Sequence, residues 1–163
     1  MTGNEHGEDI EIRQAAAFDA VLLAALHAAC FGNGGQSPQQ PAWDEAAMAQ
    51  VIASPTTLCL LATVGTKEPQ PIGFLITRAA GDEAELITIG VVRGSRNRGA
   101  GRTLLEHASD TLKASGVRTL FLEVDEANAP AIALYRTFGA EAVGRRPGYY
   151  ENGGDAAVLR LDF

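Results

Sequence analysis

The alternation of apolar and polar residues predicts a chain of short strands interrupted by helices. Apolar or alternating stretches of strand length, bounded by Gly, Pro, Asn and Asp, are found at 9–13, 57–64, 72–78, 85–91, 119–124, 143–150 and 156–163. Apolar residues at helical spacing occupy 18–31, 44–53, a segment that ends at Ser115, and 128–139. The order is strand, two helices, three strands, helix, strand, helix and two strands. This order predicts an α/β fold in which helices flank a mixed sheet.

Local signals indicate where several helices begin and end. Asp44 and Asn128 are side chains that accept hydrogen bonds from the first N–H groups of a helix. Pro130 fits the first turn of the helix that Asn128 begins, because this position needs no backbone donor. Gly116 suits a helix C-terminus. Segment 32–41 is rich in Gly, Pro and Gln, and it therefore predicts a loop between the first two helices.

Length and composition suit a single small enzyme or binding domain. The chain has 163 residues, 46% of them apolar, which we expect to form one domain over 9–163 after a flexible segment at 1–8. No apolar run reaches the ~18 residues of a membrane span, and the acidic N-terminus is unlike a secretory signal. The net charge of −7 argues against nucleic acid and anionic membranes as partners. Cys30 and Cys59 lie in apolar segments and predict free thiols. We therefore expect a cytoplasmic protein, either a monomer or a weak dimer.

A Gly- and Arg-rich turn at 93–102 is the most informative stretch. It follows the apolar strand 85–91 and leads into a helix, whose first N–H groups lack internal partners and attract anions. Four of the 13 basic residues of this acidic chain fall within it. Glycines at 99 and 101 would let the backbone approach a ligand closely. The turn therefore predicts a site for a pyrophosphate group.

Two familiar phosphate motifs fit this turn poorly. A nucleotide-binding loop would carry Lys-Ser or Lys-Thr after its glycines, and the turn contains neither of these dipeptides. A dinucleotide fingerprint needs a third glycine where Leu104 stands. Glu123 does lie about twenty positions further on, as in that fingerprint. However, Gly99 comes eight positions after Val91, whereas a dinucleotide fold turns tightly from strand to first glycine.

The spacing of Val91, Arg96 and Gly99-Ala100-Gly101 resembles the acetyl-CoA signature of the GCN5-related N-acetyltransferases, the GNAT family. Further matches follow in order at 122–124, Asn128, 131–135, 138–140 and 148–150. Together they resemble the ribosomal-protein-alanine N-acetyltransferases of the RimI type. The resemblance is strong over 82–163 and continues more weakly over 9–81.

The resemblance implies a fold whose sheet is splayed between the fourth and fifth strands, and a site for acetyl-CoA as co-substrate. The residues that it assigns to acetyl-CoA are Ile89, Gly90, Val91, Arg96, Asn97, Arg98, Gly99, Ala100, Gly101, Arg102 and Asn128. Among them, a backbone N–H near Ile89 to Val91 would hold the acetyl oxygen. Gly90 interrupts an otherwise bulky strand, which by itself predicts a bulge, a close ligand, or a bulky neighbour.

Two further side chains are candidates for acid–base chemistry. Glu123 lies in the apolar run 119–124, where a carboxylate is costly unless it is paired or functional. The resemblance implies that it is the general base for the incoming amine, acting through a water. Tyr135 lies twelve positions later, and the resemblance assigns it as the acid that protonates the leaving thiolate. The alternative for Glu123 is a carboxylate exposed to solvent near the end of its strand. The alternative for Tyr135 is a side chain that only packs in the core.

The acceptor side is predicted by the same resemblance. Tyr149 and Tyr150, with Trp43 at the end of the loop between the first helices, are expected to flank the substrate. The implied substrate is the N-terminal alanine of a protein, most simply a ribosomal protein. Three alternatives stay open: an acetyltransferase for a small amine or lysine, a non-catalytic acyl-CoA-binding domain and, more distantly, a nicotinamide dehydrogenase.

Metal chemistry is not expected. The three histidines, at 6, 27 and 107, have no second ligand at the spacing that metal sites use.

Overall fold

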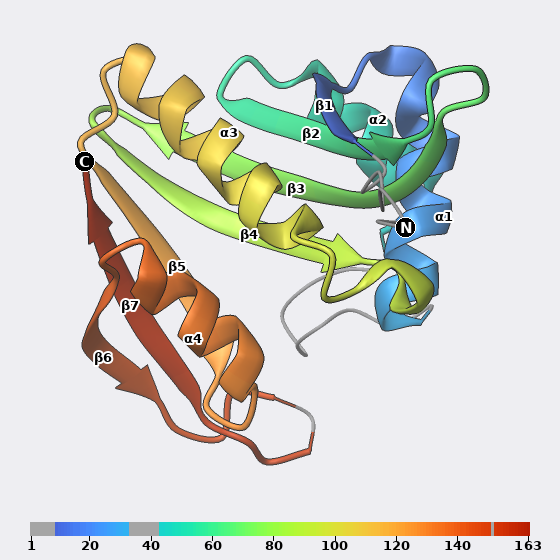
Figure 1. Ribbon diagram of the computed structural model, residues 1–163. Helices are drawn as coiled ribbons and strands as arrows, with labels where there is room; N and C mark the ends of the chain where they lie inside the picture. Colours follow the sequence, from blue (N-terminus) through green and yellow to red (C-terminus); the bar gives the residue numbers. More distant parts are fainter. Residues whose placement is uncertain (1–8, 33–42, 151) are drawn as a thin grey trace, which may run out of the picture.

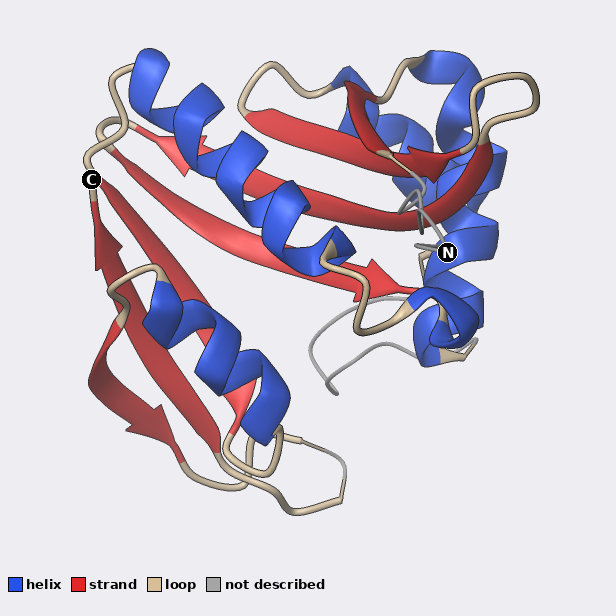
Figure 2. Cartoon of the chain, viewed as in Figure 1, coloured by secondary structure: helices blue, strands red, loops and turns tan. Residues whose placement is uncertain are grey.

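The computed structural model describes residues 9–32, 43–150 and 152–163, which build one seven-stranded sheet with helices on both faces (Figures 1 and 2). The strands are β1 (Ile10–Gln14), β2 (Thr57–Val64), β3 (Gln70–Ala80), β4 (Glu83–Val91), β5 (Thr119–Asp125), β6 (Glu141–Arg146) and β7 (Ala156–Asp162). The helices are α1 (Ala20–Phe31), α2 (Glu45–Ala53), α3 (Ala100–Ala114) and α4 (Ala129–Thr137), with short 3-10 turns η1 (Ala17–Asp19) and η2 (Arg93–Ser95). The predicted flexible segment 1–8 and most of the predicted loop 32–41 lie outside these residues.

The sheet has the order β1-β2-β3-β4-β5-β7-β6, and the pair β4–β5 is parallel while its other pairs are antiparallel. This confirms the predicted mixed sheet. The predicted caps are also confirmed: the Ala47 N–H donates to Asp44 at 2.8 Å and the Ala131 N–H donates to Asn128 at 3.2 Å. Cys30 and Cys59 are free thiols, as expected.

The strand predicted over 143–150 is wrong at both ends, because β6 spans Glu141–Arg146. Pro147, which has no N–H to donate, follows the strand directly, and Gly148 has a φ of 61°. Together these residues stop the pairing with β7. Tyr149 and Tyr150 consequently lie in the turn between β6 and β7 rather than in a strand.

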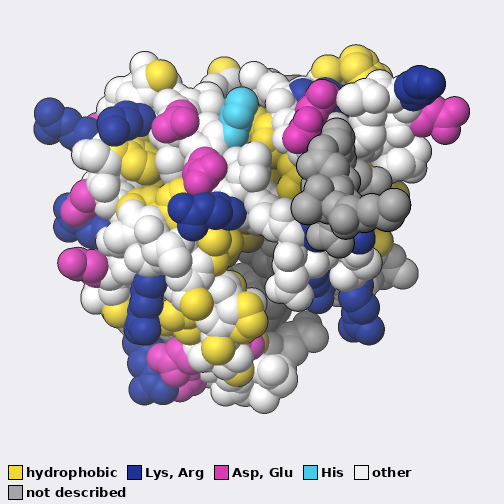
Figure 3. Space-filling view, viewed as in Figure 1, with side chains coloured by type: hydrophobic (Ala, Val, Ile, Leu, Met, Phe, Trp, Pro, Cys, Tyr) yellow, Lys and Arg dark blue, Asp and Glu magenta, His cyan; other side chains and the backbone are white. Residues whose placement is uncertain are grey.

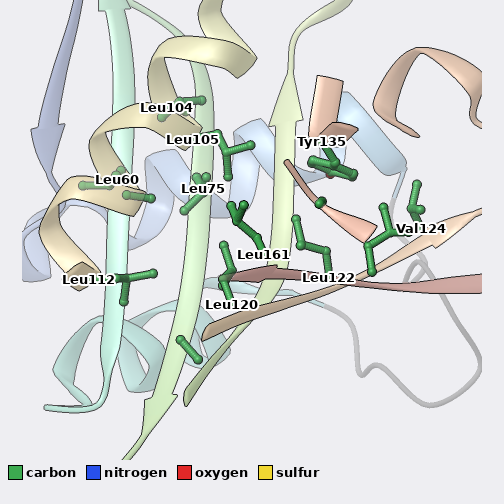
Figure 4. Close-up of a cluster of buried hydrophobic side chains, with 14 of the residues drawn as sticks. Leu60, Leu75, Leu104, Leu105, Leu112, Leu120, Leu122, Val124, Tyr135 and Leu161 are labelled. Atoms are coloured by element: carbon green, nitrogen blue, oxygen red, sulfur yellow. The ribbon is translucent and has the colours of Figure 1, made fainter. Parts of the chain in front are cut away.

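Alternating side chains of β2 and β3 build a core on each face of the sheet. Leu60 and Leu75 point to the face that α3 covers, where they join Leu104, Leu105 and residues of β5 and β7 (Figure 4). The neighbouring positions, including Leu61 and Phe74, point to the opposite face and pack with α1 and α2. α4 lies on the same face as α3 but over β5 and β7 (Figure 1). No helix among 9–32, 43–150 and 152–163 is both long and apolar enough to cross a bilayer.

The sheet opens between its two parallel strands. β4 and β5 pair only where Glu83–Leu86 face Thr119–Leu122, and beyond that point they diverge (Figure 1). The divergence coincides with a bulge in β4: Thr88 faces Ile76 and Leu86 faces Thr77 on β3, so Ile87 has no opposite residue. The bulge bends β4 away from β5 at the last shared pair. The splay is therefore a property of the backbone, and it creates the space described next.

Candidate active site

A cavity of about 480 Å³ fills the opening between β4 and β5. Its walls are side chains of both strands, of α4, of the turn after β6 and of α1. They include Leu86, Ile87, Thr88 and Ile89 of β4, Glu123, Val124 and Asp125 of β5, Asn128, Ala131 and Tyr135 at α4, and Phe31, Tyr150 and Asn152. The cavity thus brings together both predicted acid–base residues, Glu123 and Tyr135, from separate elements.

The backbone of β4 presents polar groups to this cavity. The Val92 N–H donates to the Ile72 carbonyl at 2.9 Å, so the residue after β4 still bonds toward β3. In an antiparallel pair the bonding direction alternates along the strand. The N–H groups of Ile89 and Val91 therefore point away from β3, toward the opening. The Val91 carbonyl agrees with this direction, since it accepts a hydrogen bond from Arg96 Nε at 2.9 Å rather than from β3.

Gly90 is closely packed on the side where a side chain would project. A Cβ at this residue would lie 2.8 Å from the ring of Phe74 and 3.0 Å from the sulfur of Cys30. The packing of α1 and β3 against β4 therefore leaves no room for a side chain at this position. The predicted bulky neighbour is present and the bulge lies at Ile87, while a close approach of acetyl-CoA to Gly90 stays a prediction.

The Gly- and Arg-rich turn forms an open cradle of backbone donors. Gly99 is the N-cap of α3 with a φ of 87°, and a Cβ built on it would meet nothing within 4 Å. The Thr103 N–H makes the bond to the Gly99 carbonyl at 2.9 Å that closes the first helical turn. The N–H groups of 100–102 precede this bond, and they are the donors that a helix offers to an anion. Gly101 instead faces α4, where its Cβ would contact Leu134 at 3.5 Å.

Two of the predicted phosphate-binding arginines already have protein partners. Arg96 bonds to the Val91 carbonyl and fixes the turn to the end of β4. Arg102 pairs with Glu106 at 3.0 Å, and its guanidinium lies 5.4 Å from the ring centroid of Phe138. Arg102 therefore links α3 to the end of α4 and points along the helix pair. All four arginines of the turn are exposed.

Glu123 is less buried than its apolar surroundings predict. Its side chain is 30% exposed, and Oε1 lies 2.8 Å from Nε of Arg146 on β6. Sequence reasoning missed Arg146, because β6 is separated from β5 by β7 and no spacing in the chain indicates that contact. The carboxylate faces the cavity and the partner cation lies at its outer side.

Tyr135 and Tyr150 are both protonated phenols at neutral pH. Tyr135 is 4% exposed, and burial, with a further contribution from Tyr150, raises its pKa to about 12. Burial followed by the charge of Asp125 also raises the pKa of Tyr150 to about 12. Each hydroxyl can therefore donate a hydrogen bond or a proton into the cavity without losing its proton to bulk water.

Three further predicted site residues, Asn128, Tyr149 and Trp43, differ in how they relate to the cavity. Asn128 lines it and also caps α4, so both of its predicted roles are geometrically compatible. Tyr149 lies behind Tyr150, with ring centroids 5.2 Å apart and an edge-on geometry. Trp43 packs against His27, with ring centroids 5.6 Å apart, and His27 packs in turn against Phe31, which lines the cavity.

Metal ligands are not assembled in the part of the chain that the structure describes. Groups of three or more His, Cys, Asp or Glu that could hold an ion are absent there. Burial lowers the pKa of His27 to about 4, so this histidine is a neutral member of the aromatic core.

The model of the Acetyltransferase (GNAT) family matches residues 22–140. The chain belongs to the GNAT family. It is therefore an N-acetyltransferase, and GNAT enzymes use acetyl-CoA as the acetyl donor. The dehydrogenase and the purely acyl-CoA-binding alternatives are set aside by this result.

Relatives within the GNAT family modify protein N-termini. The chain is 41% identical over 99 residues, 59% of its length and 67% of the relative, to a [ribosomal protein bS18]-alanine N-acetyltransferase of Salmonella typhimurium. It is 36% identical over 146 residues, 88% of its length and 87% of the relative, to the N-alpha-acetyltransferase RimI of Mycobacterium tuberculosis. The crystal structure of the ribosomal-protein-S18-alanine N-acetyltransferase from Escherichia coli has a TM-score of 0.74 at 32% identity, covering 94% of both chains. Arabidopsis thaliana NAA60 in complex with acetyl-CoA shares the fold, with a TM-score of 0.79 at 20% identity over 95% of this chain and 99% of that one.

Proposed function

We propose that this protein transfers the acetyl group of acetyl-CoA to the α-amine of an N-terminal alanine, most simply that of a ribosomal protein. The observation that carries the proposal is the similarity, along 88% of the chain, to an N-alpha-acetyltransferase, together with the bS18-alanine enzymes among its relatives. The cavity supports it, because Glu123 and Tyr135 offer a base and an acid on its two walls.

The chain's own groups suggest how acetyl-CoA is held. The N–H donors of 100–102 suit the pyrophosphate, and Asn128 suits the polar arm that leads from it to the thioester. The Ile89 N–H points into the opening and suits the acetyl oxygen, where it would stabilise negative charge that develops on that oxygen. The side chains of Ile87 and Ile89 contribute apolar surface to this part of the cavity wall.

We expect Gly99→Val to weaken acetyl-CoA binding at least tenfold. A β-branched residue fits poorly at a φ of 87°, and its side chain would occupy the open space beside the N–H donors. Gly101→Val should also weaken binding, because its methyl groups would push α3 from Leu134. Gly116→Val is the matched control, since Gly116 has a φ of 93° and open space but lies at the other end of α3. Titration calorimetry measures the Kd, and unchanged values in both 99 and 101 variants would refute this placement.

The reaction needs the acceptor ammonium to lose two protons. One leaves to solvent before attack, and we assign its removal to Glu123 acting through a water. The other is released as the new amide forms, and it balances the proton that Tyr135 gives to the departing thiolate. The new C–N bond replaces the C–S bond, so the products are the acetylated amine, the free thiol of coenzyme A and one proton.

An α-amine suits this site better than a lysine. The ordinary pKa of an N-terminal amine is about 7.7–8.0, against about 10.4 for lysine, so a carboxylate base deprotonates it far more readily near neutral pH. Glu123 and Asp125 place negative charge on the cavity wall, which favours a cationic acceptor.

A basic peptide that begins with Ala should therefore be acetylated on its α-amine, at a rate that rises with pH through 7–8. The measurement is intact mass and fragment mapping after incubation with acetyl-CoA. The matched control is the same peptide with a blocked N-terminus and an internal lysine, and a polyamine tests the small-molecule alternative. Acetylation of the lysine or the polyamine alone would show that the N-terminal proposal is wrong.

A further inference from the structure

Arg146 reaches the candidate base from a strand that does not adjoin it. The sheet order is β5-β7-β6, and Arg146 pairs with Ala156 of β7 while Glu123 pairs with Val158 of the same strand. Residues two apart on β7 share a face, so Arg146 and Glu123 stand on the same side of the sheet. The small side chain of Ala156 leaves the guanidinium room to cross β7. The resulting contact is the 2.8 Å ion pair between Arg146 Nε and Glu123 Oε1.

The same guanidinium has a second contact on the acceptor side. Its Cζ lies 5.8 Å from the ring centroid of Tyr149, within the range of a cation–π interaction. Tyr149 in turn packs edge-on against Tyr150, which lines the cavity. Arg146 is therefore held between the carboxylate of β5 and the tyrosine pair of the turn after β6.

The adjacent arginine makes different contacts. Arg145 pairs with Glu126 at 2.7 Å and with Asp155, both at the outer end of the sheet. It contributes to the loops there, whereas Arg146 contacts a residue of the cavity. Neighbouring residues of a strand point to opposite faces, which explains the division between these two arginines.

We propose that Arg146 is a positioning residue for Glu123. It holds Oε1 at the outer side of the carboxylate, so that Oε2 is directed at the water that receives the proton of the acceptor amine. Through Tyr149 it also fixes the acceptor-side turn relative to the base. The proposal rests on the role of Glu123 in the proposed function.

Because this ion pair is exposed to solvent, a positioning role and a role in stability predict different results when the pair is lost. The side chain of Arg146 is 56% exposed and that of Glu123 is 30% exposed. Ion pairs this accessible to water contribute little to the stability of a fold. Loss of the Arg146 guanidinium should therefore change the rate of acetylation while the melting temperature stays close to that of the wild type.

A double-mutant cycle tests the proposal, with an Ala-initiated basic peptide as acceptor and release of the coenzyme A thiol as the readout. Arg146→Gln should lower kcat about ten- to a hundredfold, the cost of misplacing a catalytic group by a fraction of an ångström to an ångström, with the KM for acetyl-CoA unchanged. Arg146→Lys should recover part of that loss, because an ammonium keeps the charge but not the planar contact with Tyr149. In the Glu123→Gln background, Arg146→Gln should add less than about a twofold further loss, since groups that act as a unit are not additive.

Arg160→Gln is the matched control. Arg160 is an exposed, ion-paired arginine of the same sheet, bonded to Asp162 at the far end of β7, and its replacement should leave kcat unchanged. Wild-type kcat in Arg146→Gln, or losses that multiply in the double variant, would overturn the positioning role while leaving the base role intact. Full activity of Glu123→Gln alone would instead overturn the base role, and the positioning role with it.

Discussion

Tyr135→Phe should lower kcat by about 10²- to 10⁴-fold, the usual contribution of a positioned acid. The change removes only a hydroxyl, and the ring, which is 4% exposed, keeps its place in the core beside Leu122 and Val124 (Figure 4). A phenol whose pKa is about 12 stays protonated throughout the working range, so its proton is present when the thiolate departs. The Kd for acetyl-CoA should stay within a few-fold of the wild type, which calorimetry checks.

Tyr150→Phe distinguishes Tyr135 from its neighbour, because the pKa of Tyr150 is also raised to about 12 and its ring also lines the cavity. If Tyr135 is the acid, the larger loss of kcat falls on Tyr135→Phe, and Tyr150→Phe mainly raises the KM for the acceptor. Near-normal turnover in Tyr135→Phe would return this residue to a role in packing alone.

Glu123→Gln should slow acetylation by about 10²- to 10⁴-fold at neutral pH, since an amide of the same shape cannot accept a proton. The loss should shrink as pH rises above about 8, because the free-amine fraction of an N-terminus then increases without help from the enzyme. The measurement is a pH–rate profile of kcat/KM for both proteins with the same peptide.

Glu126→Gln is the control for Glu123→Gln. Glu126 is a carboxylate three positions along, it pairs with Arg145, and it does not line the cavity. Its replacement should leave the profile unchanged. A profile that is likewise unmoved in Glu123→Gln would make Glu123 a structural partner of Arg146, with the amine proton leaving by another route.

Most of the fold could be predicted from local patterns because these elements carry their own signals. The caps at Asp44 and Asn128, the glycine at the start of α3, and the alternation in β2 depend on residues close in the chain. Sequence order alone also placed Glu123 and Tyr135 on adjoining elements, β5 and α4, and the cavity brings them together.

Contacts that depend on register could not be predicted in the same way. The ion pair of Arg146 with Glu123 requires the strand order β5-β7-β6 and a bulge in the β6–β7 ladder after Ala142. Neither feature can be deduced from the spacing of residues along the sequence. Trp43 likewise packs on His27 because of how α1 lies on the sheet. The lack of space for a side chain at Gly90 is due to Phe74, which lies on the neighbouring strand β3 and is remote in sequence.

One face of the molecule shows how charged side chains are distributed over α3 and α4. On the face that carries α3 and α4, acidic and basic side chains are interspersed, and neither sign forms a continuous patch (Figure 3). The described side chains on this face therefore produce no broad field of a single sign.

The opening between β4 and β5 is walled in part by peptide groups, and the cradle before α3 is floored by them. Donors of this kind belong to every amino acid except proline, so they survive most substitutions. Substitution of Tyr150 or Asn152, in the turn after β6 on the same walls, would leave those donors in place. A site divided in this way can acquire new acceptors by point mutation while it retains its acyl donor. We therefore expect a redesign of acceptor choice to act on those side chains rather than on the turn that begins α3.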